Sequence, residues 1–269
     1  MAVLVRTLFR TAIALGVLAL GLAPAYAIFG GKIVGNADPL GHALVAILYQ
    51  DGTGAHLCTG VALAPRLVLT AAHCTDGDRS DIKIIFSPSL KDVGNAHLRG
   101  VAAVARAPRT DASKGTYAYN NPDDVALVLL DQPAPTGTKF ATLAATLPSL
   151  DKLLTGGYGA TSDFRKPNAD GKRQLGFDGI LRTVMLPVTA TTGALIATDQ
   201  TRGAAACTGD SGGPAFAAGD GLTVTGILIG VSSPRATNDY CRGTAHFAAI
   251  PRWKPWLEAA AAAFGQKLP

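Results

Sequence analysis

The chain has 269 residues, 48% of them hydrophobic, so it can bury a large core as one large domain or as two smaller ones. Its formal net charge is +5, but Arg6 and Arg10 lie in an N-terminal leader without acidic residues, which leaves +3 (5 minus 2) for the rest. Because the basic residues form no run and no helix face, the charge pattern gives no indication of nucleic-acid binding.

Residues 1–27 have the three parts of a secretory signal peptide. Residues 1–10 carry the two arginines, residues 11–23 are almost wholly apolar, and Ala25-Tyr26-Ala27 is a small-x-small cleavage signal. An uncleaved membrane anchor is the alternative, but the apolar stretch is shorter than the ~20 residues that a spanning helix needs. We therefore predict a secreted or periplasmic protein with no stable membrane association after cleavage. The four cysteines fit export as well.

From residue 28 onward, short apolar runs alternate with Gly, Pro, Asn and Asp. The runs that we predict to be strands in the first half are residues 44–48, 61–63, 67–70, 82–86, 101–104 and 125–130. Two of these runs border polar side chains of chemical interest. His73 follows the third run in the sequence TAAHC, and Asp124 directly precedes the sixth, with Asp123 as the alternative acid.

A second set of runs follows a break rich in Pro and Gly at residues 133–137. The strands predicted there are residues 180–186, 194–198, 215–217 and 222–231. Short strands at such spacing are typical of an antiparallel barrel or sandwich. Residues 251–264 change to a helical period, so the chain should end in a helix that packs one apolar stripe on the body, formed by Trp253, Trp256, Leu257, Ala260, Ala261 and Phe264.

The most informative stretch is CTGDSGGP at residues 207–214. A serine flanked by glycines can stand clear of its backbone while neighbouring N–H groups point at whatever bonds to its oxygen. Ser211 is therefore the candidate nucleophile. His73 is the candidate base, and Asp124 is the candidate acid that orients the base.

The order His, Asp, Ser and the sequence around each residue resemble the chymotrypsin-like (trypsin) family of serine proteases, here a bacterial-type secreted member. The resemblance covers nearly all of the chain beyond residue 27. It implies an all-β fold of two tandem antiparallel six-stranded β-barrels with a C-terminal α-helix. The implied division is a signal peptide at 1–27, a first barrel at 28–135, a second barrel at 136–250, and the helix and tail at 251–269.

The resemblance also implies a chemical role for each residue of the site. Ser211 would attack a peptide carbonyl, His73 would carry the proton, and Asp124 would orient the imidazole. The backbone N–H groups of Gly209 and Ser211 would form the oxyanion hole. The implied disulfides join Cys58 to Cys74, around the histidine loop, and Cys207 to Cys241, across the substrate pocket. The function implied is that of a secreted serine endopeptidase acting on proteins or peptides.

Activation in this family requires a free N-terminal isoleucine whose ammonium inserts beside the acid that precedes the serine, here Asp210. Two segments compete for this role: IFGG from Ile28 and IVGN from Ile33. We favour Ile28, because signal peptidase would expose its amine directly. A start at Ile33 would instead follow cleavage after Lys32, as in a protease-cleaved propeptide.

Substrate preference depends in this family on the residue six positions before the nucleophile, which is Ala205 here. Ala205 predicts a small or apolar P1 side chain, although Asp239 could enter the pocket from the other wall. The usual Ser-Trp-Gly of the opposite wall is missing, and either residues 230–234 or residues 226–230 take its place.

No metal or cofactor is expected. Asp76, Asp78 and Asp81 lack the glycine turn and closing glutamate of a calcium loop and read as a solvated loop. We further expect a monomer that binds no nucleic acid.

Two other functional classes are considered. An α/β-hydrolase esterase would have Ser211, Asp239 and His246 in its chain order, but residues 212–214 are Gly-Gly-Pro and cannot open the helix that this fold requires. A non-catalytic binding protein on a protease fold is suggested by the unusual pocket wall. The enzyme is favoured because no member of the triad is lost, although a fold alone does not establish activity.

Overall fold

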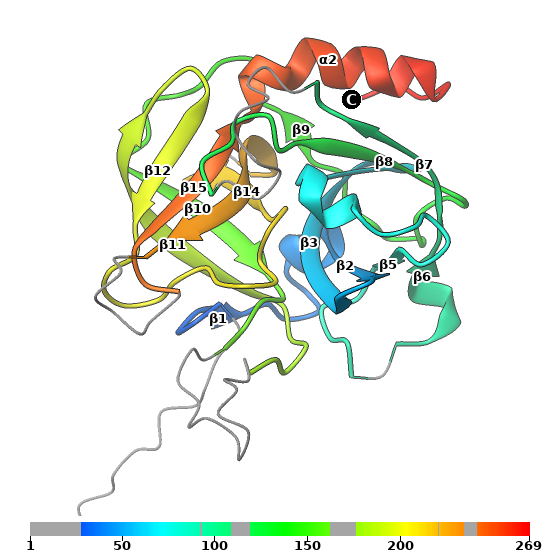
Figure 1. Cartoon of the computed structure of the whole chain (residues 1–269), viewed down its shortest axis with the longest axis horizontal. Coiled ribbons are helices and arrows are strands. Elements are labelled where there is room, and N and C mark those ends of the chain that lie inside the picture. Colours follow the sequence, from blue (N-terminus) through cyan, green and yellow to red (C-terminus); the bar gives the residue numbers. More distant parts are fainter. Residues whose placement is uncertain (1–27, 92, 109–118, 162–175, 220, 234–240) are drawn as a thin grey trace, which may run out of the picture.

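The computed structural model describes residues 28–91, 93–108, 119–161, 176–219, 221–233 and 241–269. Two mostly antiparallel sheets lie side by side, and a C-terminal helix lies across the top of the view (Figure 1). The predicted signal peptide, residues 1–27, falls outside the described residues. Within those residues, no helix is both long enough and apolar enough to span a membrane.

The first sheet has the strand order β6-β5-β2-β3-β4-β8-β7. The strands are β2 (Leu44–Asp51), β3 (Gly54–Ala64), β4 (Leu67–Thr70), β5 (Lys83–Ile85), β6 (Leu98–Arg99), β7 (Val101–Arg106) and β8 (Ala126–Leu130). Only Gly100 separates β6 from β7, so these two short strands act as one bent strand that closes a ring of six. All four residues of β4 are buried, which explains why its sequence is a continuous apolar run rather than an alternating one.

The second sheet closes by a direct pairing. Its strands are β1 (Lys32–Ile33), β9 (Thr142–Leu143), β10 (Lys152–Gly157), β11 (Arg182–Thr191), β12 (Leu195–Asp199), β13 (Pro214–Ala217), β14 (Thr223–Ser232) and β15 (Thr244–Ala249). The order β11-β10-β13-β14-β15-β12 returns to β11, because β11 pairs with both β10 and β12. The short strands β1 and β9 attach outside this ring. The predicted all-β class with two six-stranded barrels is confirmed.

The N-terminal segment departs from the predicted division of the chain. The range 28–135 assigns it to the first barrel, yet β1 pairs with β11 of the second sheet. The cause is the core of the second barrel, where Ile28 is fully buried among residues such as Leu153 and Phe247. The strands β10 and β15 were also not predicted, because KLLTGG and TAHFAA lack a run of β-branched residues.

The predicted C-terminal helix is confirmed as α2 (Ile250–Ala263). Its buried residues include Trp253, Leu257, Ala260 and Ala261, which belong to the predicted apolar stripe. The indole Nε1 of Trp253 donates a 2.8 Å hydrogen bond to the carbonyl of Pro122. The helix is thereby fastened to the loop that leads to Asp124. A second short helix, α1 (Pro39–Ala43), precedes β2 and is capped by Asp38, whose side chain accepts from the N–H of Leu40.

Candidate active site

His73 and Asp124 come from neighbouring strands of the first barrel. His73 lies in the 3₁₀ turn η1 (Ala72–Thr75) directly after β4, and Asp124 lies just before β8. Because β4 and β8 pair with Thr70 opposite Ala126, their ends bring the two residues together. Asp124 Oδ2 lies 2.6 Å from His73 Nδ1, and Asp124 Oδ1 accepts the His73 backbone N–H at 2.9 Å. A carboxylate only accepts, so Nδ1 carries the proton and Nε2 is left able to accept another.

The adjacent acid, Asp123, faces the other way. Its carboxylate lies 3.3 Å from the guanidinium of Arg252 on α2 and is almost completely buried. The side chain of Asn121 caps the same turn by accepting the N–H of Asp123. Two consecutive aspartates thus have different partners, the C-terminal helix for Asp123 and the histidine for Asp124. This geometry agrees with the choice of Asp124 as the orienting acid.

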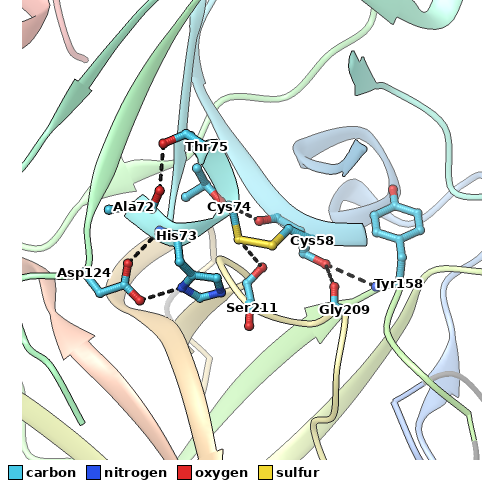
Figure 2. Close-up of a disulfide and its surroundings, with 11 residues drawn as sticks. Cys58, Ala72, His73, Cys74, Thr75, Asp124, Tyr158, Gly209 and Ser211 are labelled. Carbon is cyan, nitrogen blue, oxygen red and sulfur yellow. Dashed lines mark hydrogen bonds and ion pairs between the residues drawn. A yellow bond between two sulfur atoms is a disulfide. The ribbon is translucent and has the colours of Figure 1, made fainter. Parts of the chain in front are cut away.

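Ser211 lies in the loop that precedes β13. Figure 2 shows Ser211 on the opposite side of the His73 imidazole from Asp124. The loop is fastened to the first barrel by the N–H of Thr59, which donates to the Ser211 carbonyl at 2.8 Å. Gly212 has φ +80°, and a Cβ there would overlap the Thr70 hydroxyl, so only glycine fits after the serine.

The chain beyond Ser211 excludes the esterase alternative. After Gly212 and Gly213 the chain enters strand β13 rather than a helix. His246 hydrogen-bonds the hydroxyl of Ser232 at 2.8 Å, and Asp239 lies outside the described residues. The residues that the structure describes also form two closed, mostly antiparallel sheets, not the parallel sheet between layers of helices that this class has.

Gly209 lies at the bend two residues before the serine. Its φ is +95°, and a Cβ would come within 2.8 Å of the Gly159 Cα, so no larger residue fits. The carbonyl of Thr208 accepts from the N–H of Ala160 at 2.7 Å, and the carbonyl of Gly209 accepts from the Thr59 hydroxyl at 3.0 Å. Both peptide groups around Gly209 are therefore held by segments distant in the sequence.

Similarity to known proteins assigns the chain to a family. A family model described as trypsin matches residues 33–257, which is most of the chain. The chain belongs to the trypsin family of serine proteases. Rat granzyme M is 28% identical over 250 residues, covering 85% of this chain and 89% of the relative. Human granzyme M is 30% identical over 141 residues, covering 52% of each chain.

Two solved structures show the same fold. Neuropsin, a serine protease expressed in the limbic system of mouse brain, superposes with a TM-score of 0.66 and 22% identity over 86% of this chain and 99% of its own. A scabies mite inactivated protease paralogue superposes with a TM-score of 0.64 and 19% identity over 87% of this chain and 99% of its own. At these identities the likeness concerns the fold alone.

Both disulfides implied by the trypsin-family resemblance are present. The bridge Cys58–Cys74 joins β3 to the turn that carries His73 (Figure 2). The bridge Cys207–Cys241 joins the start of the serine loop to the segment before β15. Ala205 is fully buried and packs in an apolar cluster with Ala160 and this second bridge.

Asp210, the residue before Ser211, is fully buried. Its carboxylate accepts from the N–H of Gly159 at 2.7 Å and from the N–H of Cys207 at 2.8 Å. Burial raises the pKa of Asp210 to about 7, although these two hydrogen bonds act in the opposite direction. In the described part of the chain, no cationic side chain pairs with Asp210. In this chain the Asp210 carboxylate has room only because residues 157 and 159 are glycines, since a Cβ at either position would overlap it.

The two isoleucine candidates differ sharply in environment. Ile28 is fully buried, whereas Ile33 is 50% exposed. Phe29 forms an antiparallel bridge with Ala205, and its carbonyl accepts the Ala205 N–H at 2.8 Å. The segment from Ile28 therefore runs beside the residues that precede the serine loop, while Ile33 lies on β1 at the surface.

Two polar residues at this trypsin-family site were missed in the sequence. Thr59 is fully buried and contacts the serine loop through both its backbone and its side chain. Gln200 is also fully buried. Its amide nitrogen donates to the carbonyls of Ala206 and Cys241, and its amide oxygen accepts the Ala206 N–H, so it ties the two sides of the Cys207–Cys241 bridge together. A single threonine or glutamine carries no sequence pattern that could have revealed these contacts.

Among the described residues, one group of side chains has the spacing of metal ligands. Cys58, His73 and Cys74 lie close enough to share an ion, but both sulfurs are committed to a disulfide and offer no thiolate. Asp76, Asp78 and Asp81 line an open hollow together with Gln50, Asp51 and Gly77. Asp76 is already paired with Arg106 at 3.3 Å.

Proposed function

We propose that this protein is a secreted serine endopeptidase that cleaves peptide bonds through Ser211, His73 and Asp124. The observation that carries the proposal is the 2.6 Å contact between His73 Nδ1 and Asp124 Oδ2, with Ser211 on the other side of the imidazole (Figure 2). This arrangement leaves the second ring nitrogen available to the serine. Membership of the trypsin family makes proteins or peptides the class of substrate.

The reaction follows from what each group can accept or donate. His73 Nε2 takes the proton of the Ser211 hydroxyl as its oxygen attacks the peptide carbonyl, and Asp124 stabilises the imidazolium that forms. The N–H groups of Gly209 and Ser211 bind the oxyanion of the tetrahedral intermediate. The imidazolium then returns the proton to the leaving amine, which leaves an acyl-enzyme. Water, deprotonated by the same imidazole, hydrolyses the ester and restores the serine.

Activation is proposed to occur at Ile28. Cleavage after Ala27 would free the amine of Ile28, whose neighbour Phe29 bridges to Ala205 on the segment that leads to Asp210. The full burial of Ile28 supports this choice over Ile33. In the uncleaved chain Ile28 has φ +35°, which is unfavourable for a β-branched residue. Release of the preceding peptide bond would remove that constraint.

N-terminal sequencing of the active protein tests this choice. A start at Ile28 is expected. A start at Ile33 would replace it with cleavage after Lys32, and an active protein that begins at neither isoleucine would contradict the proposed activation.

A small or apolar P1 side chain is the proposed preference. Ala205 offers no carboxylate to a basic side chain, and its surroundings are Ala160 and the Cys207–Cys241 bridge. We assign the opposite wall of the pocket to β14. Leu228 of this strand exchanges hydrogen bonds with Gly212 and Gly213, so the part of β14 that extends beyond the serine loop begins at Ile229. Gly230 on this strand packs against Tyr119, and a Cβ added to Gly230 would lie only 3.1 Å from Tyr119, so a larger residue would require Tyr119 to shift.

Further properties complete the proposal. Secretion, in an extracellular or periplasmic compartment, is supported by the signal-like leader and by the two disulfides. A bacterial type of protease stays a prediction, because the relatives described above come from animals. We also propose that the mature enzyme is monomeric and binds neither nucleic acid nor membranes.

A non-catalytic binding protein is the second candidate, since one structural neighbour is itself an inactivated paralogue. Reaction with a fluorophosphonate probe separates the two functions, because the probe adds covalently only to an activated serine. We expect stoichiometric labelling of the secreted protein at Ser211 and none in Ser211→Ala. Absence of labelling in the wild-type protein would favour the binding protein, and labelling that persists in Ser211→Ala would refute the choice of nucleophile.

The same preparation tests the substrate preference. Incubation with a peptide library, followed by mass spectrometry of the products, should find cuts after small or apolar residues. Cuts predominantly after Arg or Lys would contradict the assignment of Ala205 to the pocket.

A further inference from the structure

Thr59 lies in β3 of the first barrel and reaches across to the serine loop of the second. Its side chain is fully buried. The hydroxyl lies 3.0 Å from the carbonyl oxygen of Gly209 and 3.2 Å from the backbone nitrogen of Tyr158. Figure 2 shows Gly209 and Tyr158 as the two ends of this bridge. The contact links residues 150 positions apart in the sequence.

The direction of the two hydrogen bonds is fixed by chemistry. The Tyr158 N–H can only donate, so it occupies a lone pair of the Thr59 oxygen. The single hydroxyl hydrogen of Thr59 is then directed to the Gly209 carbonyl, which can only accept. No second donor reaches that carbonyl from the residues that the structure describes. The peptide between Gly209 and Asp210 is therefore held at its carbonyl by this one hydroxyl, while its N–H, that of Asp210, donates to the Cys207 carbonyl at 3.0 Å.

This peptide adjoins the proposed oxyanion hole. On the other side of Gly209, Ala160 holds the Thr208 carbonyl at 2.7 Å, and in a trans peptide the Gly209 N–H points away from that carbonyl. Gly209 has no side chain and a φ of +95°, so its backbone has no steric restraint of its own. Its N–H keeps one direction only if the peptides on both sides are held.

Thr59 also holds the other residue of the hole. Its backbone N–H donates to the Ser211 carbonyl at 2.8 Å, and its own carbonyl accepts the Thr70 hydroxyl at 2.8 Å. One residue of the first barrel thus contacts the carbonyls of both residues whose N–H groups would bind the oxyanion. Its hydroxyl donates to the Gly209 carbonyl, and its backbone N–H donates to the Ser211 carbonyl.

We propose that Thr59 is a positioning residue for the oxyanion hole, whose hydroxyl keeps the Gly209 N–H directed at the developing charge of the substrate. The inference rests on the proposed serine endopeptidase function and deepens it. A hydroxyl with this task affects the transition state more than substrate binding, because the oxyanion exists only once the serine has attacked.

The test compares Thr59→Val, which keeps the shape but removes the hydroxyl, with Thr59→Ser, which keeps the hydroxyl. Thr225→Val is the matched control, because Thr225 is equally buried and its hydroxyl also donates to a backbone carbonyl, that of Ala215 at 3.0 Å. For each secreted protein, kcat and KM are measured on a peptide amide, together with inhibition by a peptide boronic acid that forms a tetrahedral adduct on the serine.

We expect Thr59→Val to lower kcat by about ten- to a hundredfold with KM changed less than about twofold, and to weaken boronate inhibition by a similar factor. Thr59→Ser and Thr225→Val should stay within about threefold of wild type. If Thr59→Val does not accumulate as folded protein, Thr59→Ala removes the same hydroxyl and carries the same expectation.

The inference is overturned if Thr59→Val keeps wild-type kcat, if its loss appears in KM alone, or if Thr225→Val or Thr59→Ser loses as much. A failure of the proposed function looks different. In that case the wild-type protein itself shows neither turnover nor fluorophosphonate labelling, and both proposals fall.

Discussion

On the first-barrel side of the site, the carboxylate of Asp124 accepts both the ring and the backbone N–H of His73. On the second-barrel side, the loop around Ser211 is held mainly through its peptide groups, with partners at Thr59, Ala160 and Leu228, and also through the buried carboxylate of Asp210. The first side is positioned by a specific side chain at the ends of paired strands. The second is positioned by glycines that allow distant backbone to approach. The two sides should therefore respond to different kinds of substitution.

The largest effect is expected on the histidine side. Asp124→Asn should lower kcat by about 10⁴-fold, because an amide can stabilise the wrong imidazole tautomer and cannot offset the imidazolium charge. Asp123→Asn is the matched control. Its carboxylate contacts Arg252 and not His73, so kcat should change less than about tenfold. A larger loss in Asp123→Asn than in Asp124→Asn, measured by steady-state kinetics, would reverse the assignment of the two acids.

Asp210→Asn tests the second-barrel side. Removing one partner of a buried ion pair commonly costs about 3–5 kcal/mol, so activity of the mature enzyme should fall by about 10²- to 10⁴-fold with all three triad residues intact. Wild-type activity should also fall above pH ~8 as the Ile28 amine loses its proton. A full-strength Asp210→Asn enzyme, with Ile28 as its N-terminus, would show that the proposed pair does not order the loop.

In the uncleaved chain, the buried carboxylate of Asp210 has no cationic side chain beside it among the described residues. The pKa of Asp210 is raised to about 7, so between about pH 4 and 7 the folded state retains a proton that the unfolded state has lost. Stability of the uncleaved protein should therefore fall as pH rises through this window, by on the order of 4 kcal/mol.

Urea unfolding of uncleaved Ser211→Ala protein, with and without Asp210→Asn, measures this contribution. Asn does not titrate, so the double variant should lose that part of the pH dependence. Equal pH dependence in the two proteins would show that Asp210 does not titrate in this range.

The disulfides offer a smaller contrast between the two sides. Replacing either pair by serines should destabilise the protein by about 2–4 kcal/mol, mainly through the unfolded chain. Loss of Cys58–Cys74 should leave the Ser211 loop's backbone contacts in place, whereas loss of Cys207–Cys241 releases the start of that loop. Peptide mapping without reduction should recover these two pairs. A Cys58–Cys207 link would contradict the layout of the two barrels.

The local sequence determined a large part of the fold and of the site. The continuous apolar runs at 67–70 and 125–130 became β4 and β8, because buried strands need little more than apolar, β-branched side chains in sequence. The helical period at 251–264 became α2 for the same local reason. The sequences around His73, Asp124 and Ser211 were sufficient to propose the three residues as a triad, since each belongs to a short motif with its own backbone requirements.

Other features depended on contacts between segments distant in the chain. The direction of Asp123 is set by Arg252 on α2. The burial of Ile28 in the core of the second barrel, which supports it over Ile33 as the proposed N-terminus, is likewise visible only in the structure. Thr59 and Gln200 are single polar residues in apolar or mixed stretches of the sequence, and the residues next to them in the chain do not indicate which groups they bind. Periodicity and motifs record interactions over a few residues, whereas a hydrogen bond from Thr59 to Gly209 exists only after two barrels have packed together. The sequence by itself therefore determined which residues we propose for the chemistry, and only the tertiary structure decided what holds them.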